Sequence, residues 1–158
     1  MIGVDRMSDI QAILSSEIDA SKAKRNKMIF IVAKDVSLNQ LRGSIDHMKI
    51  PIVNVGLLLS EKIRQLPPER RPLEVGKVLR TLVIQKNKDE IFLDHIEYLF
   101  DRELKQNPIR LFENLSGNKT IIIRWPGTFE NGTLKYATPE HHEYYQSDNS
   151  YENYVVEI

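Results

Sequence analysis

The chain has 158 residues, 41% of them hydrophobic, and its 22 basic residues balance 22 acidic ones. This length suffices for one domain with a substantial core and is too short for two ordinary domains, so we expect a single domain. The balanced charge creates no overall field toward nucleic acid or an anionic membrane, so such a partner would need a local patch. Cysteine is absent, which excludes disulfides, zinc–thiolate sites and thiol catalysis.

The N-terminal region predicts a helix and gives no sign of a targeting or membrane segment. Ser8 and Gln11 have the spacing of a capping box, and apolar residues follow at helical spacing up to about Arg25. We therefore expect residues 1–26 to form an N-terminal helical extension. The first ten residues lack an apolar signal core, and no run approaches the roughly 18 apolar residues of a membrane span. These features predict a soluble, cytoplasmic protein without membrane contact.

The next segments alternate between strand and helix patterns. Residues 28–32 are continuously apolar and predict a buried strand. Ser37 and Gln40 repeat the capping pattern, which predicts a helix to about Met48 after a short loop. Residues 50–55 predict a second strand, with a proline near its start, where a missing donor is tolerated.

Helix and strand patterns continue through the middle of the chain. The leucine-rich segment 57–66 predicts a helix that ends at the prolines 67 and 68. Pro72 suits the first turn of an amphipathic helix that reaches Val83. A strand over residues 90–93 then ends at Asp94, and Asn107 with Pro108 begins the following helix.

Residues 119–124 carry a β-branched run typical of a strand covered on both faces. Later, Asn131 and Gly132 predict a turn, residues 133–137 a short strand and residues 138–140 the start of a helical turn. Residues 146–153 are polar, and we expect flexibility there, whereas the last five residues predict an edge strand. The alternation of strands and helices predicts an α/β fold with a mainly parallel sheet covered by helices.

The loop after the first strand has the position of a phosphate-binding loop but lacks its chemistry. Such loops read G-x-x-x-x-G-K-[ST], because glycine torsions let backbone N–H groups converge on one anion. The corresponding window 33–40 has neither glycine nor the terminal lysine, and Asp35 would repel a phosphate. A solvated Lys34 is the simpler interpretation, although its ammonium group has the charge to contact an anion. We predict a three-layer P-loop NTPase-like fold whose nucleotide site is degenerate.

Charged residues after two later strands suggest a second part of that site. Asp94 lies at the expected carboxyl edge of the sheet, where open α/β folds bind ligands. With a nucleotide bound, Asp94 would hold magnesium and Glu97 would activate water. The alternative is that Asp94 caps a turn or pairs with a cation, and we expect Arg124, at the end of the next strand, to be that cation. We expect His95 to be a hydrogen-bonded structural residue.

Several aromatic and basic residues admit both structural and binding roles. Trp125 is expected to pack at the sheet edge, and the adjacent histidines His141 and His142 lack a defined metal geometry. The basic end of the first helix complements the helix dipole. It also forms, with two later arginines, the best candidate for nucleic-acid contact, which comprises Lys22, Lys24, Arg25, Lys27, Arg70 and Arg71.

Three segments resemble one family: residues 91–100, which contain Asp-His-Ile-Glu; residues 115–127, which end in Trp-Pro-Gly; and residues 136–142. They are similar to the BrxF family of small P-loop proteins from BREX anti-phage systems, and the resemblance spans roughly residues 27–145. It implies an accessory subunit of bacterial phage defence, encoded beside a methyltransferase, a large ATPase and an alkaline-phosphatase-like protein. The resemblance places Asn39 where the family's phosphate-binding lysine belongs and Gln40 where its magnesium hydroxyl belongs, and neither can serve as that motif requires.

The leading hypothesis is an adaptor that binds other BREX proteins and needs no cofactor. A second hypothesis is an ATP-binding switch or ATPase, completed in an oligomer, with Asp94 on magnesium and Glu97 near water. The nucleotide would then contact residues of the first loop and the end of the fourth strand, namely Lys34, Ser37, Asn39, Gln40 and Arg124. A third hypothesis is a DNA-binding accessory subunit that uses the six basic residues.

Overall fold

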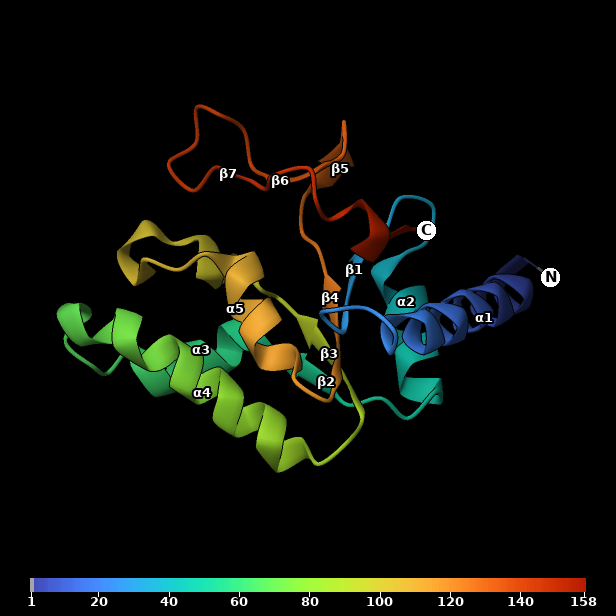
Figure 1. The fold of residues 1–158 in the computed structure, drawn as a ribbon, viewed down its shortest axis with the longest axis horizontal. Helices are drawn as coiled ribbons and strands as arrows, with labels where there is room; N and C mark the ends of the chain where they lie inside the picture. Colours follow the sequence, from blue (N-terminus) through green and yellow to red (C-terminus); the bar gives the residue numbers. More distant parts are fainter. Residues whose placement is uncertain (1) are drawn as a thin grey trace.

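A computed structural model describes the backbone of residues 2–158 and the side chains of residues 7–158. Its centre is a five-stranded sheet in the order β2–β3–β4–β1–β8, in which every neighbouring pair is parallel (Figure 1). The strands are β1 (Met28–Val32), β2 (Ile52–Asn54), β3 (Glu90–Asp94), β4 (Thr120–Arg124) and β8 (Val155–Glu157). The predicted mainly parallel sheet is confirmed, including the edge strand near the end of the chain.

Helices cover both faces of the sheet. Figure 1 shows α1 and α2 on one side and α3, α4 and α5 on the other. The helices are α1 (Ile2–Ser21), α2 (Leu38–His47), α3 (Val55–Ile63), α4 (Arg71–Lys86) and α5 (Pro108–Ser116). Short 3₁₀ segments connect these elements: η1 (Pro68–Arg70), η2 (Glu97–Phe100), η3 (Arg102–Leu104) and η4 (Glu152–Tyr154). The fold is therefore α/β with three layers.

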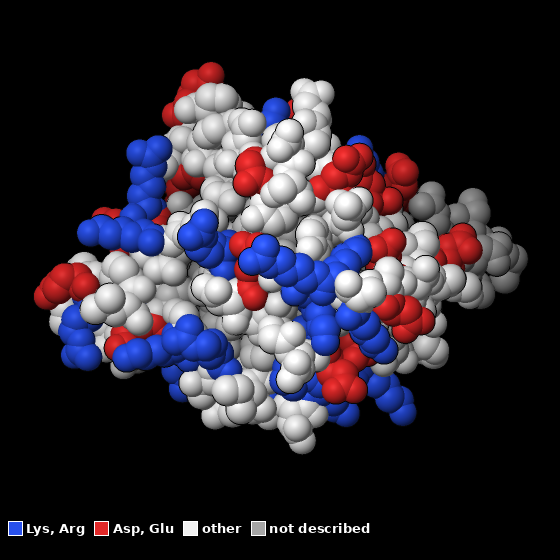
Figure 2. Space-filling model, viewed as in Figure 1, with Lys and Arg blue, Asp and Glu red and all other residues white. Residues whose placement is uncertain are grey.

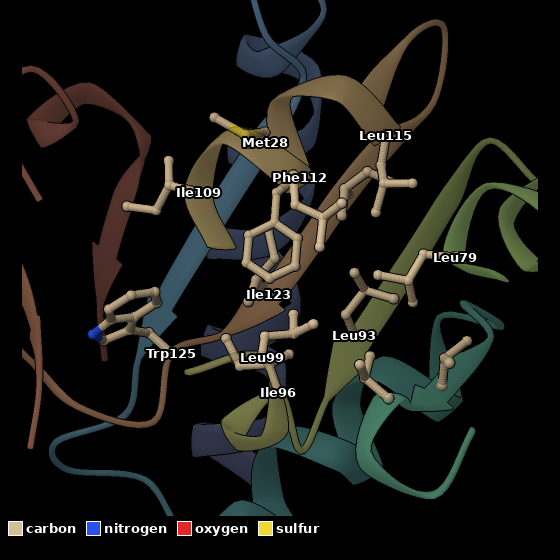
Figure 3. Close-up of a cluster of buried hydrophobic side chains, with 14 of the residues drawn as sticks. Met28, Leu79, Leu93, Ile96, Leu99, Ile109, Phe112, Leu115, Ile123 and Trp125 are labelled. Carbon is tan, nitrogen blue, oxygen red and sulfur yellow. The ribbon is translucent and has the colours of Figure 1, made fainter. Parts of the chain in front are cut away.

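Two hydrophobic cores lie on opposite faces of the sheet. Ile29 and Ile31 of β1 pack with buried residues of α1 and α2, whereas Phe30 faces the larger core under α3, α4 and α5. Figure 3 shows this larger core, in which side chains of β1, β3, β4, α4 and α5 meet. Because every side chain of β1 is buried, its sequence is continuously apolar rather than alternating.

A small antiparallel sheet follows β4 and is anchored to its end. It comprises β5 (Thr128–Glu130), β6 (Thr133–Tyr136) and β7 (Tyr145–Gln146). Its first turn contains Asn131 and Gly132 in left-handed torsions, as the sequence predicts. The buried indole of Trp125 donates a 2.9 Å hydrogen bond to the carbonyl of Lys135, so the predicted packing of this tryptophan at the sheet edge is confirmed.

The start and end of the first helix differ from the prediction. The helix includes Ile2, so Ser8 lies inside it and its predicted cap is wrong, because interior N–H groups already bond to carbonyls of the preceding turn. The helix ends at Ser21 instead of Arg25, and the Ser21 hydroxyl donates to the Ile18 carbonyl at 2.7 Å. Ile10 and Leu14 are buried against the domain, which makes α1 part of its core.

The structure refines two smaller predictions. Asn54 accepts a hydrogen bond from the Leu57 N–H and caps α3, so Val55 is helical and the second strand is shorter than predicted. The segment that starts at Thr138 forms a single turn, in which the His141 N–H donates to the Thr138 carbonyl at 2.9 Å, and no helix follows it. None of the helices within residues 2–158 is both long enough and apolar enough to cross a membrane.

Candidate functional site

Asp94 is the centre of a charged cluster at the carboxyl edge of the sheet. Its side chain is buried at the end of β3. Oδ2 accepts a hydrogen bond from Arg42 Nε at 2.8 Å and lies 2.7 Å from Arg42 Nη2 in the same ion pair. Oδ1 accepts from Arg124 Nε and from the N–H of His95 at 2.9 Å. Both oxygens of the carboxylate therefore have partners within the chain. The predicted ion pair between Asp94 and Arg124 is confirmed.

Three structural elements bring the arginines to Asp94. Arg124 ends β4, the strand next to β3, and Arg42 extends from α2 across the sheet edge. Arg124 Nη2 also lies 3.6 Å from Glu97 Oε1, so the predicted water-activating carboxylate faces an arginine. We call these residues the Asp94 cluster: Arg42, Asp94, His95, Glu97 and Arg124.

The arginines control the ionisation of Asp94. Burial alone raises the pKa of this carboxyl, but hydrogen bonds from Arg124 and Arg42 and the attraction of Arg124 outweigh burial and hold the pKa below its usual value. Asp94 is therefore a carboxylate at neutral pH, and the charge of one arginine compensates it. A magnesium ion at this position would have to displace a guanidinium group.

His95 joins the cluster in a constrained backbone conformation. Its φ of 53° is left-handed, and its carbonyl accepts the Gly56 N–H at 2.9 Å. Arg42 Nη2 lies 2.9 Å from His95 Nε2. Because a guanidinium only donates, Nε2 accepts and the proton of the neutral ring lies on Nδ1. The predicted structural role of His95 as a hydrogen-bonded residue is confirmed.

The loop at residues 33–36, which the sequence predicts to be a degenerate phosphate-binding loop, contacts another part of the same chain. The N–H groups of Lys34 and Asp35 both donate to the Ile158 carbonyl oxygen, at 2.5 and 3.0 Å. The Lys34 ammonium pairs with Glu157 of β8. Two adjacent N–H groups thus converge on one oxygen, as in an anion-binding loop, but the oxygen comes from the residue after β8.

Ser37 and Gln40 form the predicted capping box of α2. Ser37 Oγ accepts the Gln40 N–H at 3.1 Å, and Gln40 Oε1 accepts the Ser37 N–H at 2.9 Å. Asn39 lies between them, exposed in the first turn of α2. The polar groups of Ser37 and Gln40 thus satisfy the helix N-terminus.

The structure unites only part of the predicted nucleotide site. It brings Asp94, Glu97 and Arg124 together, whereas Lys34 points to β8, on the far side of β1 from β3. Sequence reasoning missed Arg42. The available indication was its place in α2 three residues before the apolar Ile45, which is buried and so marks the helix face toward the sheet.

The basic residues of the predicted nucleic-acid site occupy separate parts of the molecule. Lys22 pairs with Asp19 at 3.7 Å, and Lys24 donates to the Asn153 carbonyl, both near the amino edge of the sheet. Arg71 donates to the Arg64 and Leu66 carbonyls beyond the end of α3, at 2.9 and 3.0 Å. Figure 1 places this end of α4 away from the end of α1, and Figure 2 shows basic side chains interspersed with acidic ones. The six cations do not form one patch.

The histidine pair is placed on an exposed segment. The rings of His141 and His142 stack with centroids 4.6 Å apart, and His141 Nδ1 accepts the Glu143 N–H. Within the part of the chain that the structure describes, no group of three or more acidic or histidine side chains is arranged to hold a metal ion.

Comparisons with known proteins give no relative: no family model, no curated protein and no solved structure matches the chain.

Proposed function

We propose that this protein is a P-loop-type adaptor that does not hydrolyse nucleotide and acts by binding other proteins, as an accessory subunit of a bacterial BREX defence system. Two observations carry the first part of the proposal. Asp94, where a P-loop enzyme would hold magnesium, is buried and accepts hydrogen bonds from Arg42 and Arg124. The loop N–H groups, where phosphate would bind, donate to the Ile158 carbonyl.

The energetic cost of using this site for a nucleotide supports the proposal. Magnesium binding at Asp94 would leave at least one arginine without its carboxylate, and breaking a buried ion pair costs about 3–5 kcal/mol. Arg124 bears most of this cost because its side chain is only 12% exposed. Since each 1.4 kcal/mol is tenfold in affinity, a nucleotide would bind roughly a hundredfold to several thousandfold more weakly than to a preformed site.

The defence assignment is supported by the resemblance of residues 91–100, 115–127 and 136–142 to the BrxF family. The partners proposed on that basis are the large ATPase, the methyltransferase and the phosphatase-like subunit of the same system. An adaptor would recognise one of them through its surface, because its sheet edge is engaged in contacts within the chain.

Calorimetric titration with ATP and with ADP, each with and without magnesium, tests the loss of the nucleotide site. We expect no saturable heat up to millimolar nucleotide. Saturable, magnesium-dependent binding that disappears in a folded Asp94→Asn variant would overturn the proposal in favour of an ATP-binding switch. Asp46→Asn is the matched control, because Asp46 is exposed on α2 and has no side-chain partner among the described residues.

Size-exclusion chromatography with each purified BREX subunit tests the adaptor role. We expect a stable complex with at least one of the three subunits, without added nucleotide. If no subunit co-elutes, the BREX assignment fails, whatever the outcome of the nucleotide titration.

A further inference from the structure

A groove between α3 and α4 lies on the outside of the three-layer fold. The two helices lie side by side (Figure 1), and the groove between them has a volume of about 320 Å³. Leu58 of α3 and Val78 and Leu82 of α4 line it with half-buried apolar side chains. Lys62 of α3 and Lys77 of α4 contribute its positive charges.

The spacing of the wall residues matches the periodicity of a helix. The α4 wall repeats every three or four residues from Glu74 to Gln85, which is three turns or about 17 Å of helix. On α3, Leu58 and Lys62 are one turn apart. The α4 wall is thus three turns long and the α3 wall one turn, and a groove between two helices of this kind accepts the apolar stripe of a third helix.

Exposed apolar side chains gather on the same two helices. Leu57 of α3 is 57% exposed, and Leu73 and Ile84 of α4 are 74% and 72% exposed. These are three of the six large hydrophobic side chains that are exposed within residues 7–158. They lie outside the groove lining, with Leu73 and Ile84 near the two ends of α4, so the inference depends on the lining itself and not on these side chains.

The charge of the groove indicates what kind of helix would bind. Lys77 lies 3.9 Å from Glu74 but remains 66% exposed, and Lys62 has no ion pair among the described residues. A partner helix with basic residues beside its apolar stripe would be repelled by Lys62 and Lys77. A partner with acidic residues would meet attraction instead.

We propose that the α3–α4 groove binds an amphipathic helix of a partner protein, with apolar residues in the groove and acidic residues facing Lys62 and Lys77. This inference rests on the proposed adaptor function, because it names the surface through which the adaptor engages its partner. The groove itself is formed by residues outside the Asp94 cluster.

Fluorescence anisotropy with two labelled designed helices tests the inference. Both peptides carry leucines at i, i+3, i+4 and i+7 over four turns, and one has glutamates and the other lysines beside this stripe. We expect the glutamate peptide to bind about tenfold more tightly than the lysine peptide at low salt. The double variant Lys62→Glu/Lys77→Glu should reverse this order.

A second double variant controls for overall charge. Arg80→Glu/Arg110→Glu makes the same change in net charge with residues outside the groove lining, so it should leave the preference unchanged. Equal affinity of both peptides, or a preference that the control abolishes as well, would overturn the inference. Sedimentation velocity that shows a dimer dissociated by Leu82→Asp would assign the groove to a second copy and overturn it too.

The outcomes separate this inference from the function on which it rests. If a BREX subunit co-elutes with the protein and with the Lys62→Glu/Lys77→Glu variant equally well, the adaptor function stands and the groove inference fails. If no BREX subunit binds but the glutamate peptide shows the expected preference, the groove inference stands and the BREX assignment fails.

Discussion

Asp94 couples the stability of the protein to pH. Its pKa is lowered in the folded state, so between the folded value and the unfolded value of about 3.9 the unfolded chain binds more protons. The stabilisation is therefore complete above about pH 4 and is lost as the pH falls through the folded pKa. We expect the free energy of unfolding, measured with urea, to fall below pH 4.

The Asp94→Asn variant isolates this contribution. At pH 7 its free energy of unfolding should be about 3 kcal/mol lower than that of the parent, because two arginines lose their carboxylate partner. The difference should shrink as the pH falls below about 4. A difference that stays constant over this range would mean that the pKa of Asp94 is not lowered by folding. Asp46→Asn should show neither effect.

At the scale of secondary-structure elements, substitution of alanine for glycine should lower the free energy of unfolding at Gly127 but not at Gly43. A Cβ on Gly127 would lie 1.8 Å from the Lys135 carbonyl oxygen, where the backbone after β4 meets β6. Gly127→Ala should therefore separate the hairpin from the sheet, lower the free energy of unfolding by about 3 kcal/mol, and expose Trp125. A red shift in the emission of this single tryptophan would report the separation.

Gly43→Ala is the matched comparison inside α2. The nearest atom to its new Cβ is the flexible end of Met7, at 3.4 Å. Since alanine favours a helix interior over glycine by about 0.5–1 kcal/mol, this variant should be at least as stable as the parent. Equal destabilisation by both substitutions would show that the close approach at Gly127 is unimportant.

The start of a helix could be predicted from the sequence where the capping interaction joins residues close together in the chain. Ser37 and Gln40 are three residues apart, and the Asn107 side chain caps α5 by accepting the Arg110 N–H, so both helix starts are visible in the sequence. The start of α1 was not predictable in this way, because Ser8 and Gln11 fit a cap equally well inside a helix. The predicted strand 50–55 was too long, because the side chain of Asn54 caps α3.

The candidate site could be predicted only in part, because it is formed by contacts between distant parts of the chain. Asp94 and Arg124 were both expected at the carboxyl edge because they end predicted parallel strands. Arg42 reaches Asp94 from a helix 52 residues earlier, and no short motif encodes that contact. The bond from the Lys34 N–H to Ile158 likewise depends on β8 pairing beside β1, which periodicity alone does not specify.

At the scale of the whole molecule, charged groups lie at opposite edges of the central sheet. Lys22, Lys24, Arg25 and Lys27 precede β1 at the amino edge, whereas the Asp94 cluster lies at the carboxyl edge. Arg70 lies at the distant end of α4 (Figure 1). Of the six predicted residues, a DNA duplex would therefore meet at most four at once, and Lys22 and Lys24 of these already have partners.

This distribution predicts weak and sequence-independent DNA binding. Since each neutralised phosphate contributes about −0.9 to the slope of log K against log salt, the four predicted residues at this edge contribute at most about −3.6. In anisotropy titrations with DNA we expect a slope shallower than this value. The double variant Lys22→Ala/Arg25→Ala should make the slope shallower still, whereas Arg70→Ala should leave it unchanged. A slope steeper than −3.6, or weaker binding by Arg70→Ala, would place separated basic residues on one DNA surface. The DNA-binding hypothesis would then replace the adaptor function as the better account of this fold.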